Sequence, residues 1–162
     1  MIITDPHIKM DEEYRVYKLG KDLDLKPDPD NPELFNNIYI KSKVMIPFEG
    51  SSWPGNSVWI DFINEGAQKF WKSLYKYEFF KGTDENYGIW IDMNEPSVNS
   101  LEDNTMIKNA YHFLGNSFRV MHRDVHNSYG HMMAKATYEG LVERDRGELR
   151  PFVLSRSVFL GS

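Results

Sequence analysis

Three short apolar runs are spaced along the chain, and a stretch with helical periodicity lies between each run and the next. The runs occupy residues 1–4, 88–91 and 152–155. The middle run is apolar without interruption, which is typical of parallel strands that are covered on both faces. Alternation of strands and helices favours a parallel sheet with helical crossovers. The sequence therefore predicts an α/β fold.

The two helical stretches begin at different residues. Asn64 is a good N-cap for the first, whose apolar residues recur at intervals of three and four: Ala67, Phe70, Trp71, Leu74, Tyr75 and Phe79. Asp124 is predicted to cap the second, which runs to about Arg146 and stops at Gly147. Residues 10–50 are polar and broken by prolines, which predicts a long loop excursion with a small hairpin.

A charged residue follows each predicted strand: Asp5 after the first, Asp92 after the second and Arg156 after the third. Parallel α/β folds bind ligands at the carboxyl ends of their strands. We therefore expect these three side chains to share one rim of the sheet.

Both a doubly wound sheet and a (β/α)8 barrel present groups at such a rim. The long loops after the strands, and the lack of a glycine-rich phosphate motif, favour the barrel. A TIM barrel typically needs about 250 residues, whereas this chain has 162. We therefore expect a partial (β/α)8 TIM barrel, with about three of its strands, two of its helices and long loops.

The stretch IWIDMNEPS places two carboxylates at the tip of the middle strand, those of Asp92 and Glu95. A carboxylate at this position can act as a nucleophile, a base, a metal ligand or the cap of the following turn. More polar residues follow Asp92 than a connecting turn needs. A catalytic role for these carboxylates is therefore about as well supported as a capping role. Strand alternation puts Trp90 on the same side as Asp92.

Two further motifs carry polar chemistry. Arg156 has two compatible roles, as a salt bridge between strand and loop or as a fork of donors for substrate hydroxyls or a carboxylate.

His122 and His126 are spaced for one helix face, but the zinc-helix pattern needs Glu after the first His, and Arg123 stands there. We expect no metal site, and interpret His126 with Asn127 as a structural polar pair.

The composition excludes several classes of partner. The net charge is −5 and the isoelectric point is near 5.5, which gives no basic surface for nucleic acid or an anionic membrane. No window approaches the roughly 20 apolar residues of a membrane span. Cysteine is absent, which removes disulfides and thiolate metal sites. We therefore expect no nucleic-acid partner and no membrane span.

Taken together, these motifs resemble glycoside hydrolase family 31, the α-glucosidases and α-xylosidases. The strand-end signature of that family, W-x-D-M-N-E-P-S, matches residues 90–97 in full. Further matches occur in the family's order: DPHI at 5–8, WPG at 53–55, DF at 61–62, HN-x-YG at 126–130 and RPF-x-x-SRS at 150–157.

The resemblance implies a role for each candidate residue. Asp92 is the implied nucleophile and Glu95 an active-site acid that supports it. The implied sugar-binding residues are Trp53, Trp90 and Met93, which line the glucose pocket, and Asp5 and Arg156, which contact sugar hydroxyls or orient groups that do. The implied reaction is retaining hydrolysis of a terminal α-glucosidic bond from the non-reducing end, without a metal or organic cofactor.

The family's acid/base aspartate lies in a W-x-G-D motif beyond the last matched motif, and the sequence stops at residue 162. We therefore expect residues 1–162 to be a segment of the family's catalytic barrel within a larger gene product, and to be inactive alone. DPHIK and HRDVHN resemble the neutral α-glucosidase group. That resemblance implies N-glycan trimming in the lumen of the endoplasmic reticulum, on an oligosaccharide with terminal α-glucose, with a noncatalytic β subunit as partner.

Three other functions remain open at the level of sequence. The first is a starch- or maltose-degrading α-glucosidase, or an α-xylosidase, of the same family. The second is a sugar-binding pseudoenzyme that keeps the pocket and has lost the acid. The third is a generic α/β domain whose acids are caps.

Overall fold

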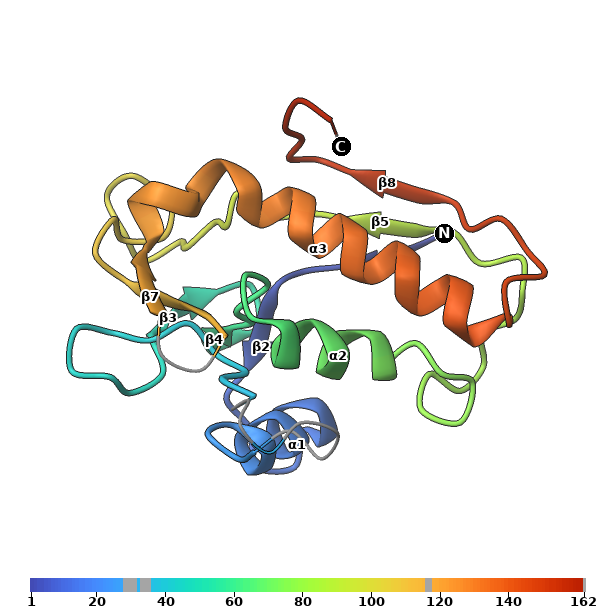
Figure 1. The fold of residues 1–162 in the computed structure, drawn as a ribbon, viewed down its shortest axis with the longest axis horizontal. Helices are drawn as coiled ribbons and strands as arrows, with labels where there is room; N and C mark the ends of the chain where they lie inside the picture. The colour runs from blue at the N-terminus through green and yellow to red at the C-terminus, as the bar shows by residue number, and fades with distance from the viewer. Residues whose placement is uncertain (28–31, 33–35, 116–117, 162) are drawn as a thin grey trace.

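The computed structural model describes residues 1–27, 32, 36–115 and 118–161. Figure 1 shows α2 and α3 side by side, with the strands β5 and β8 running along α3. In chain order the elements are β1 (Ile2–Thr4), β2 (His7–Lys9), α1 (Arg15–Leu23), β3 (Glu49–Ser52), β4 (Gly55–Trp59), α2 (Glu65–Ser73), β5 (Ile89–Ile91), β6 (Tyr111–Leu114), β7 (Phe118–Met121), α3 (His122–Arg144) and β8 (Val153–Ser155).

β5 is the central strand of a parallel sheet. It pairs with β1 on one side and with β8 on the other, and the register aligns Ile2, Ile89 and Val153 in one row. The predicted parallel α/β arrangement is therefore confirmed. Within the described residues this sheet has three strands and is open, so it is a partial and not a closed barrel.

The two faces of the parallel sheet have different surroundings. Ile89 and Ile91 of β5 are fully buried in the apolar core, to which α2 and α3 also contribute. The opposite face carries the row Ile3, Trp90 and Leu154. Ile3 is 53% exposed and Leu154 is 44% exposed. The helices therefore cover one face of the sheet and leave the other accessible.

A second sheet is antiparallel, in the order β2–β4–β3, and a separate hairpin joins β6 to β7. β3 and β4 are connected by the tight turn at Trp53 and Pro54. The sequence did not predict these strands, because stretches such as EGSS and GNS lack the apolar alternation of a half-buried strand.

The excursion at residues 10–50 is not loop throughout, and that part of the prediction was wrong. It contains the helix α1, in which Gly20 is buried against Tyr39 so closely that a Cβ there would collide with the Tyr39 hydroxyl. Its apolar residues Val16, Leu19 and Leu23 recur at intervals of three and four, a helical spacing that the interpretation of this region as a polar loop overlooked. Later in the excursion, an antiparallel bridge pairs Lys41 with Pro47 around a tight turn.

α2 begins where the sequence predicted. Asn64 is its N-cap, and its side-chain Oδ1 accepts a hydrogen bond from the backbone N–H of Ala67 at 3.1 Å. Asn64 is fully buried, so the amide N–H that it satisfies has no access to water. The helix then packs on α3, where the indole of Trp71 donates to the hydroxyl of Thr137 at 2.9 Å.

Replacing this cap should destabilise the fold measurably. We expect Asn64→Ala to lower the free energy of unfolding by roughly 1–2 kcal/mol, because a buried helix N–H loses its acceptor. The measurement is chemical denaturation of the protein that carries this chain. Asn56→Ala, at an exposed position of β4, is the control and should change stability by less than about 0.5 kcal/mol. Equal effects of the two changes would contradict the assigned cap.

α3 starts two residues before the predicted cap. Its N-cap is Met121, which makes no side-chain capping bond, and Asp124 lies in the first turn. The first amide groups are satisfied in another way: His122 N–H donates to the carbonyl of Ala110 and Arg123 N–H to that of Lys108. These acceptors are distant in sequence, so a local capping rule could not find them.

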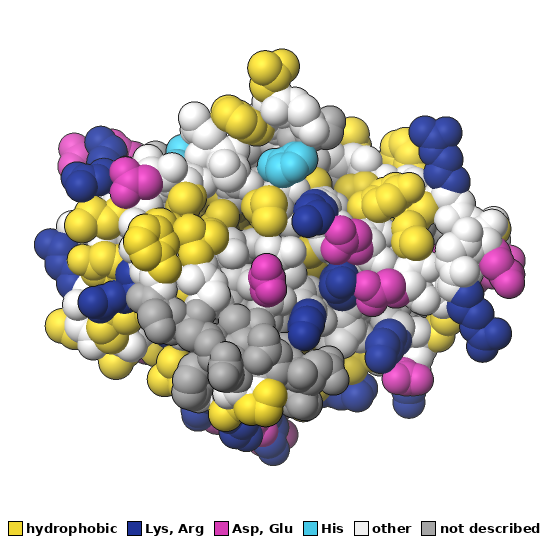
Figure 2. All heavy atoms as spheres, viewed as in Figure 1, with side chains coloured by type: hydrophobic (Ala, Val, Ile, Leu, Met, Phe, Trp, Pro, Cys, Tyr) yellow, Lys and Arg dark blue, Asp and Glu magenta, His cyan; other side chains and the backbone are white. Residues whose placement is uncertain are grey.

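Charged side chains of both signs are distributed over the surface. Figure 2 shows basic and acidic side chains interspersed over one face, and the described residues form no continuous basic surface there. None of the helices in the described part of the chain is both long enough and apolar enough to cross a membrane.

Candidate active site

The charged residues that follow β1, β5 and β8 project from the accessible face of the parallel sheet. Side chains alternate along a strand, so each charged residue continues the row of Ile3, Trp90 and Leu154. The backbone pairing also continues past the strands, since Arg156 N–H donates to the carbonyl of Ile91 at 3.0 Å. The strand ends therefore bring together groups that are separated by up to 151 positions in the sequence (5 to 156).

Arg156 is the centre of this cluster. Its guanidinium makes a two-pronged contact with Glu95, Nε to Oε1 at 2.9 Å and Nη2 to Oε2 at 2.7 Å. The remaining nitrogen, Nη1, lies 2.9 Å from Oδ1 of Asp92. One arginine thus neutralises and orients two carboxylates, and planar bidentate pairs of this kind are among the strongest hydrogen bonds in proteins. It ties strand to loop, as the first of its two predicted roles requires.

Asp92 is fixed through one of its two carboxylate oxygens. Oδ1 accepts from the backbone N–H of Met93 at 2.9 Å and faces Arg156. None of the described residues hydrogen-bonds to Oδ2. The side chain is 22% exposed, so it is held by protein on one side and is accessible on the other. This is the geometry that an attacking carboxylate requires.

Glu95 is held in its ionised form. Burial opposes ionisation, but the hydrogen bonds from Arg156 and Ser97 outweigh it and lower the pKa of Glu95 below its usual value. Ser97 donates its hydroxyl to Oε2 at 2.7 Å. A carboxylate that is ionised and fully engaged with donors is a poor proton donor, so Glu95 is suited to orienting Arg156.

Asp5 has the opposite electrostatic character. Burial and the negative charge of Asp92 raise its pKa to about 6, although Arg156 acts to lower it. One of its oxygens, Oδ1, is buried without a hydrogen-bond partner among the described residues. The other lies 3.5 Å from the ring of His7, whose pKa burial lowers to about 4. At neutral pH that imidazole is uncharged, so the contact is not a salt bridge between two full charges.

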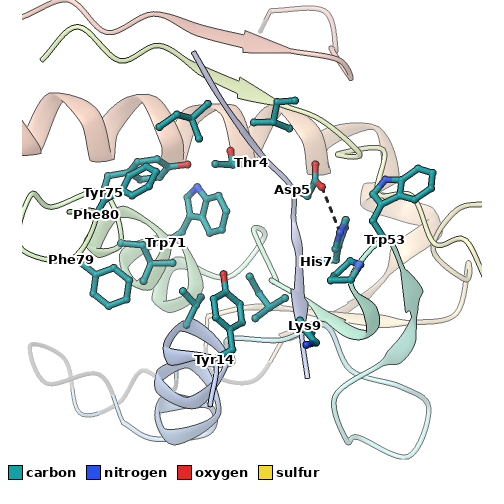
Figure 3. A pocket seen from close by; sticks show the side chains of 16 residues that line it. Thr4, Asp5, His7, Lys9, Tyr14, Trp53, Trp71, Tyr75, Phe79 and Phe80 are labelled. Carbon is teal, nitrogen blue, oxygen red and sulfur yellow. Dashed lines mark ion pairs between the residues drawn. The ribbon is translucent and has the colours of Figure 1, made fainter. Parts of the chain in front are cut away.

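The aromatic candidates occupy different places. Trp53 lies at the β3–β4 turn and is 73% exposed. Figure 3 shows it with His7 and Asp5 at one end of a cavity of about 810 Å³. The rest of that cavity is mostly apolar and extends along β1 to Tyr75 and Phe80, away from the carboxylates. Only the end near Asp5 therefore belongs to the candidate site.

The remaining candidates lie on β5 and just after it. Trp90 is partly buried on the accessible face. Met93 is nearly buried in the left-handed conformation, with φ of 57°, and its sulfur lies 3.4 Å from Nη2 of Arg156. The structure thus joins Asp92, Glu95, Met93 and Arg156 by direct contacts, and places Asp5 within electrostatic reach of them.

The two histidines singled out in HRDVH belong to a separate, buried cluster. Asp61 Oδ1 lies 2.7 Å from Nδ1 of His112, whose Nε2 lies 2.8 Å from Nδ1 of His122. Nε2 of His122 is in turn 2.7 Å from Nδ1 of His126. Sequence reasoning missed His112 and Asp61 as partners, because they come from β6 and from the loop before α2. Among the described residues no group of three or more side chains is arranged to hold a metal ion.

Comparison with known proteins connects this geometry to a family of enzymes. A family model described as the glycosyl hydrolases family 31 TIM-barrel domain matches residues 1–162. Glucosidase 2 subunit alpha of Schizosaccharomyces pombe is 42% identical over 164 aligned residues, which cover 100% of this chain and 16% of the relative. Human neutral alpha-glucosidase C is 40% identical over 162 residues, again 16% of the relative.

The similarity extends to solved structures. A crystal structure of glucosidase II alpha subunit in a Glc1Man2-bound form superposes with a TM-score of 0.84 at 44% identity, and the match covers 99% of this chain and 16% of that one. The chain thus spans about a sixth of the relatives it matches. Because the family model matches the chain from end to end and the relatives align with nearly all of it, the chain belongs to glycoside hydrolase family 31.

Proposed function

We propose that this chain supplies the nucleophile-bearing part of a retaining α-glucosidase. The observation that carries the proposal is Asp92, an accessible carboxylate at the end of β5 that is oriented by Arg156 at 2.9 Å. The names of the relatives support it, since they are α-glucosidases of the same family. In the proposed reaction Asp92 attacks the anomeric carbon of a terminal α-glucose while the glycosidic C–O bond breaks and the leaving oxygen takes a proton from a second carboxyl group. Water then hydrolyses the resulting glycosyl ester and frees Asp92.

Arg156 and Asp5 have complementary tasks in this proposal. Arg156 orients Asp92 through the 2.9 Å contact of Nη1 with Oδ1, while Glu95 holds the guanidinium from its other edge. Asp5, with its raised pKa, can accept or share hydrogen bonds with sugar hydroxyls in either protonation state. Trp53, at the polar end of the cavity, offers an exposed ring on which a sugar can stack.

The acid/base partner of Asp92 is proposed to lie outside residues 1–162. A retaining glycosidase needs a second carboxyl group, about 5–5.5 Å from the nucleophile, that starts protonated. Glu95 does not fit this task, because its pKa is lowered and both of its oxygens accept hydrogen bonds from Arg156. We therefore propose that a residue outside this stretch completes the pair.

The proposed substrate is an N-glycan oligosaccharide with terminal α-glucose. Support comes from the relatives: one solved structure is described as an ER glucosidase II complex of a catalytic subunit with the binding domain of a regulatory subunit, and it matches this chain with a TM-score of 0.82. By this similarity we propose action in the lumen of the endoplasmic reticulum with a noncatalytic β subunit as partner.

The proposal is tested with the full-length protein that carries residues 1–162 and with the isolated chain. The full-length protein should hydrolyse an aryl α-glucoside and release α-glucose first, as proton NMR of the fresh product would show. An aryl α-xyloside should be a much poorer substrate, and the isolated chain should show no turnover. Initial release of β-glucose, preference for the xyloside, or turnover by the isolated chain would each contradict the corresponding part of the proposal.

A further inference from the structure

Asn94 is a buried side chain whose amide contacts the residues on both sides of Arg156. It is completely inaccessible to solvent. Its Nδ2 donates to the hydroxyl of Ser155 at 2.8 Å, and its Oδ1 accepts from the backbone N–H of Ser157 at 3.0 Å. The tip of β5 is thereby fastened to the end of β8 at two points that flank Arg156.

The orientation of this amide is fixed by its surroundings. The Ser155 hydroxyl donates to the carbonyl of Ser157 at 2.7 Å, so it accepts from Asn94. The carbonyl oxygens of Gly130 and Ser157 also face Nδ2, at 3.4 and 3.5 Å. The group at the Nδ2 position must therefore donate hydrogen bonds. An amide nitrogen can do so, whereas a carboxylate oxygen cannot.

The helix α3 packs against Asn94 from a third direction. A Cβ at Gly130 would lie 2.7 Å from the backbone oxygen of Asn94 and 3.0 Å from its Nδ2. Glycine at this position therefore lets the helix backbone touch the β5 tip directly. The amide is held between two strand ends and a helix, so it has little freedom to shift.

We propose that Asn94 is a positioning residue that sets the placement of Arg156 between Asp92 and Glu95. It does not point at the substrate site, and acts by fixing the backbone of the residues before and after Arg156. The guanidinium then reaches Asp92 at 2.9 Å and Glu95 at 2.7 and 2.9 Å at the same time. This inference rests on the proposed α-glucosidase function and adds a specific residue to it.

The test is Asn94→Asp in the full-length protein, which keeps the size and one acceptor of the side chain but removes its donor. We expect kcat/KM for an aryl α-glucoside to fall roughly 100-fold, the loss that a misplacement of about 1 Å can produce. Asn99→Asp, at an exposed position of the following loop, is the matched control and should leave kcat/KM within about twofold.

A double-mutant cycle separates positioning from a general structural role. If Asn94 acts through Arg156, then Asn94→Asp introduced on an Arg156→Gln background should lower kcat/KM by less than about threefold more. A full 100-fold further loss on that background would overturn the inference. Should Asn94→Asp fail to fold, Ser155→Ala, which removes the acceptor of Nδ2, replaces it in the same cycle with the same criterion.

The outcomes also distinguish this inference from the proposed function. A wild-type protein that hydrolyses α-glucosides, with an Asn94→Asp variant of unchanged kcat/KM, would refute the positioning role alone. A folded wild-type protein without α-glucosidase activity would refute the proposed function and this inference with it.

Discussion

Asp92→Asn in the full-length protein is expected to lower kcat by roughly 10⁴-fold or more, the scale of loss that follows removal of a nucleophile. The amide keeps the size of the side chain and can still accept from Met93 N–H, as Oδ1 does at 2.9 Å. It has neither the charge nor the nucleophilicity of a carboxylate. The measurement is steady-state hydrolysis of an aryl α-glucoside, accompanied by thermal unfolding to show that the variant is folded.

A matched variant and a product analysis sharpen this test. Asp103→Asn, an exposed aspartate in the loop after Asp92, should retain full activity. In Asp92→Gly the attacking group is gone and space is left on its face of the sugar. With an activated aryl α-glucoside, added azide should then attack the anomeric carbon, expel the phenolate and give the β-glycosyl azide. Unchanged activity of Asp92→Asn would show that Asp92 has no covalent role.

Part of this architecture is visible in the sequence because it is encoded locally. β5 is a continuous apolar run that ends in a charge, and α2 has a cap and an apolar repeat, so both follow from neighbouring residues. The placement of Asp5, Asp92 and Arg156 at one rim follows from the rule that parallel strands share a direction. These features can therefore be predicted without knowing which distant residues are in contact.

Several of the features that the sequence did not predict depend on pairs of residues that are far apart along the chain. α3 starts at His122 because carbonyls near residue 110 accept from its first amides. Asn94 gains its role only when β8 brings Ser155 and Ser157 beside it. The bidentate contact of Arg156 with Glu95 likewise joins residues 61 positions apart. No local pattern specifies such partners, so they emerge only from the fold.

The largest pH effect on stability is expected from the buried chain of Asp61, His112, His122 and His126. Asp61 accepts hydrogen bonds from Nδ1 of His112 and from the backbone N–H groups of Ile63 and Phe113. Its neighbour His112 must then carry a proton on Nδ1. Burial, followed by the effect of the two adjacent imidazoles, lowers the pKa of His122 to about 3. The central ring is therefore neutral in the folded protein.

The sign of the effect follows from linkage. In the unfolded chain a histidine has a pKa near 6.5, so between pH 6.5 and about 3 the unfolded state binds a proton at His122 that the folded state does not. Stability is present above pH 6.5 and is lost as the pH falls through this window. His7, with its pKa lowered to about 4, acts in the same direction.

Asp5 opposes this loss, because its raised pKa of about 6 makes the folded state bind the extra proton as the pH falls. On acidification, His122 and His7 therefore lower the free energy of unfolding, whereas Asp5 raises it. With about 1.4 kcal/mol per pH unit for each group, we expect a net loss of roughly 2–3 kcal/mol between pH 6.5 and 4.5. The thermal midpoint of the full-length protein should accordingly fall on acidification within this range.

His122→Gln assigns the pH effect to the buried chain. Glutamine can still donate and accept a hydrogen bond but does not titrate, so the variant should be less stable at pH 7.5 and lose less stability on acidification. Asn99→Gln, at an exposed position that does not titrate, is the control and should keep the wild-type pH slope. If the His122 variant kept the wild-type slope as well, the acid sensitivity would have to arise elsewhere, because removing a titrating imidazole cannot leave its proton linkage in place.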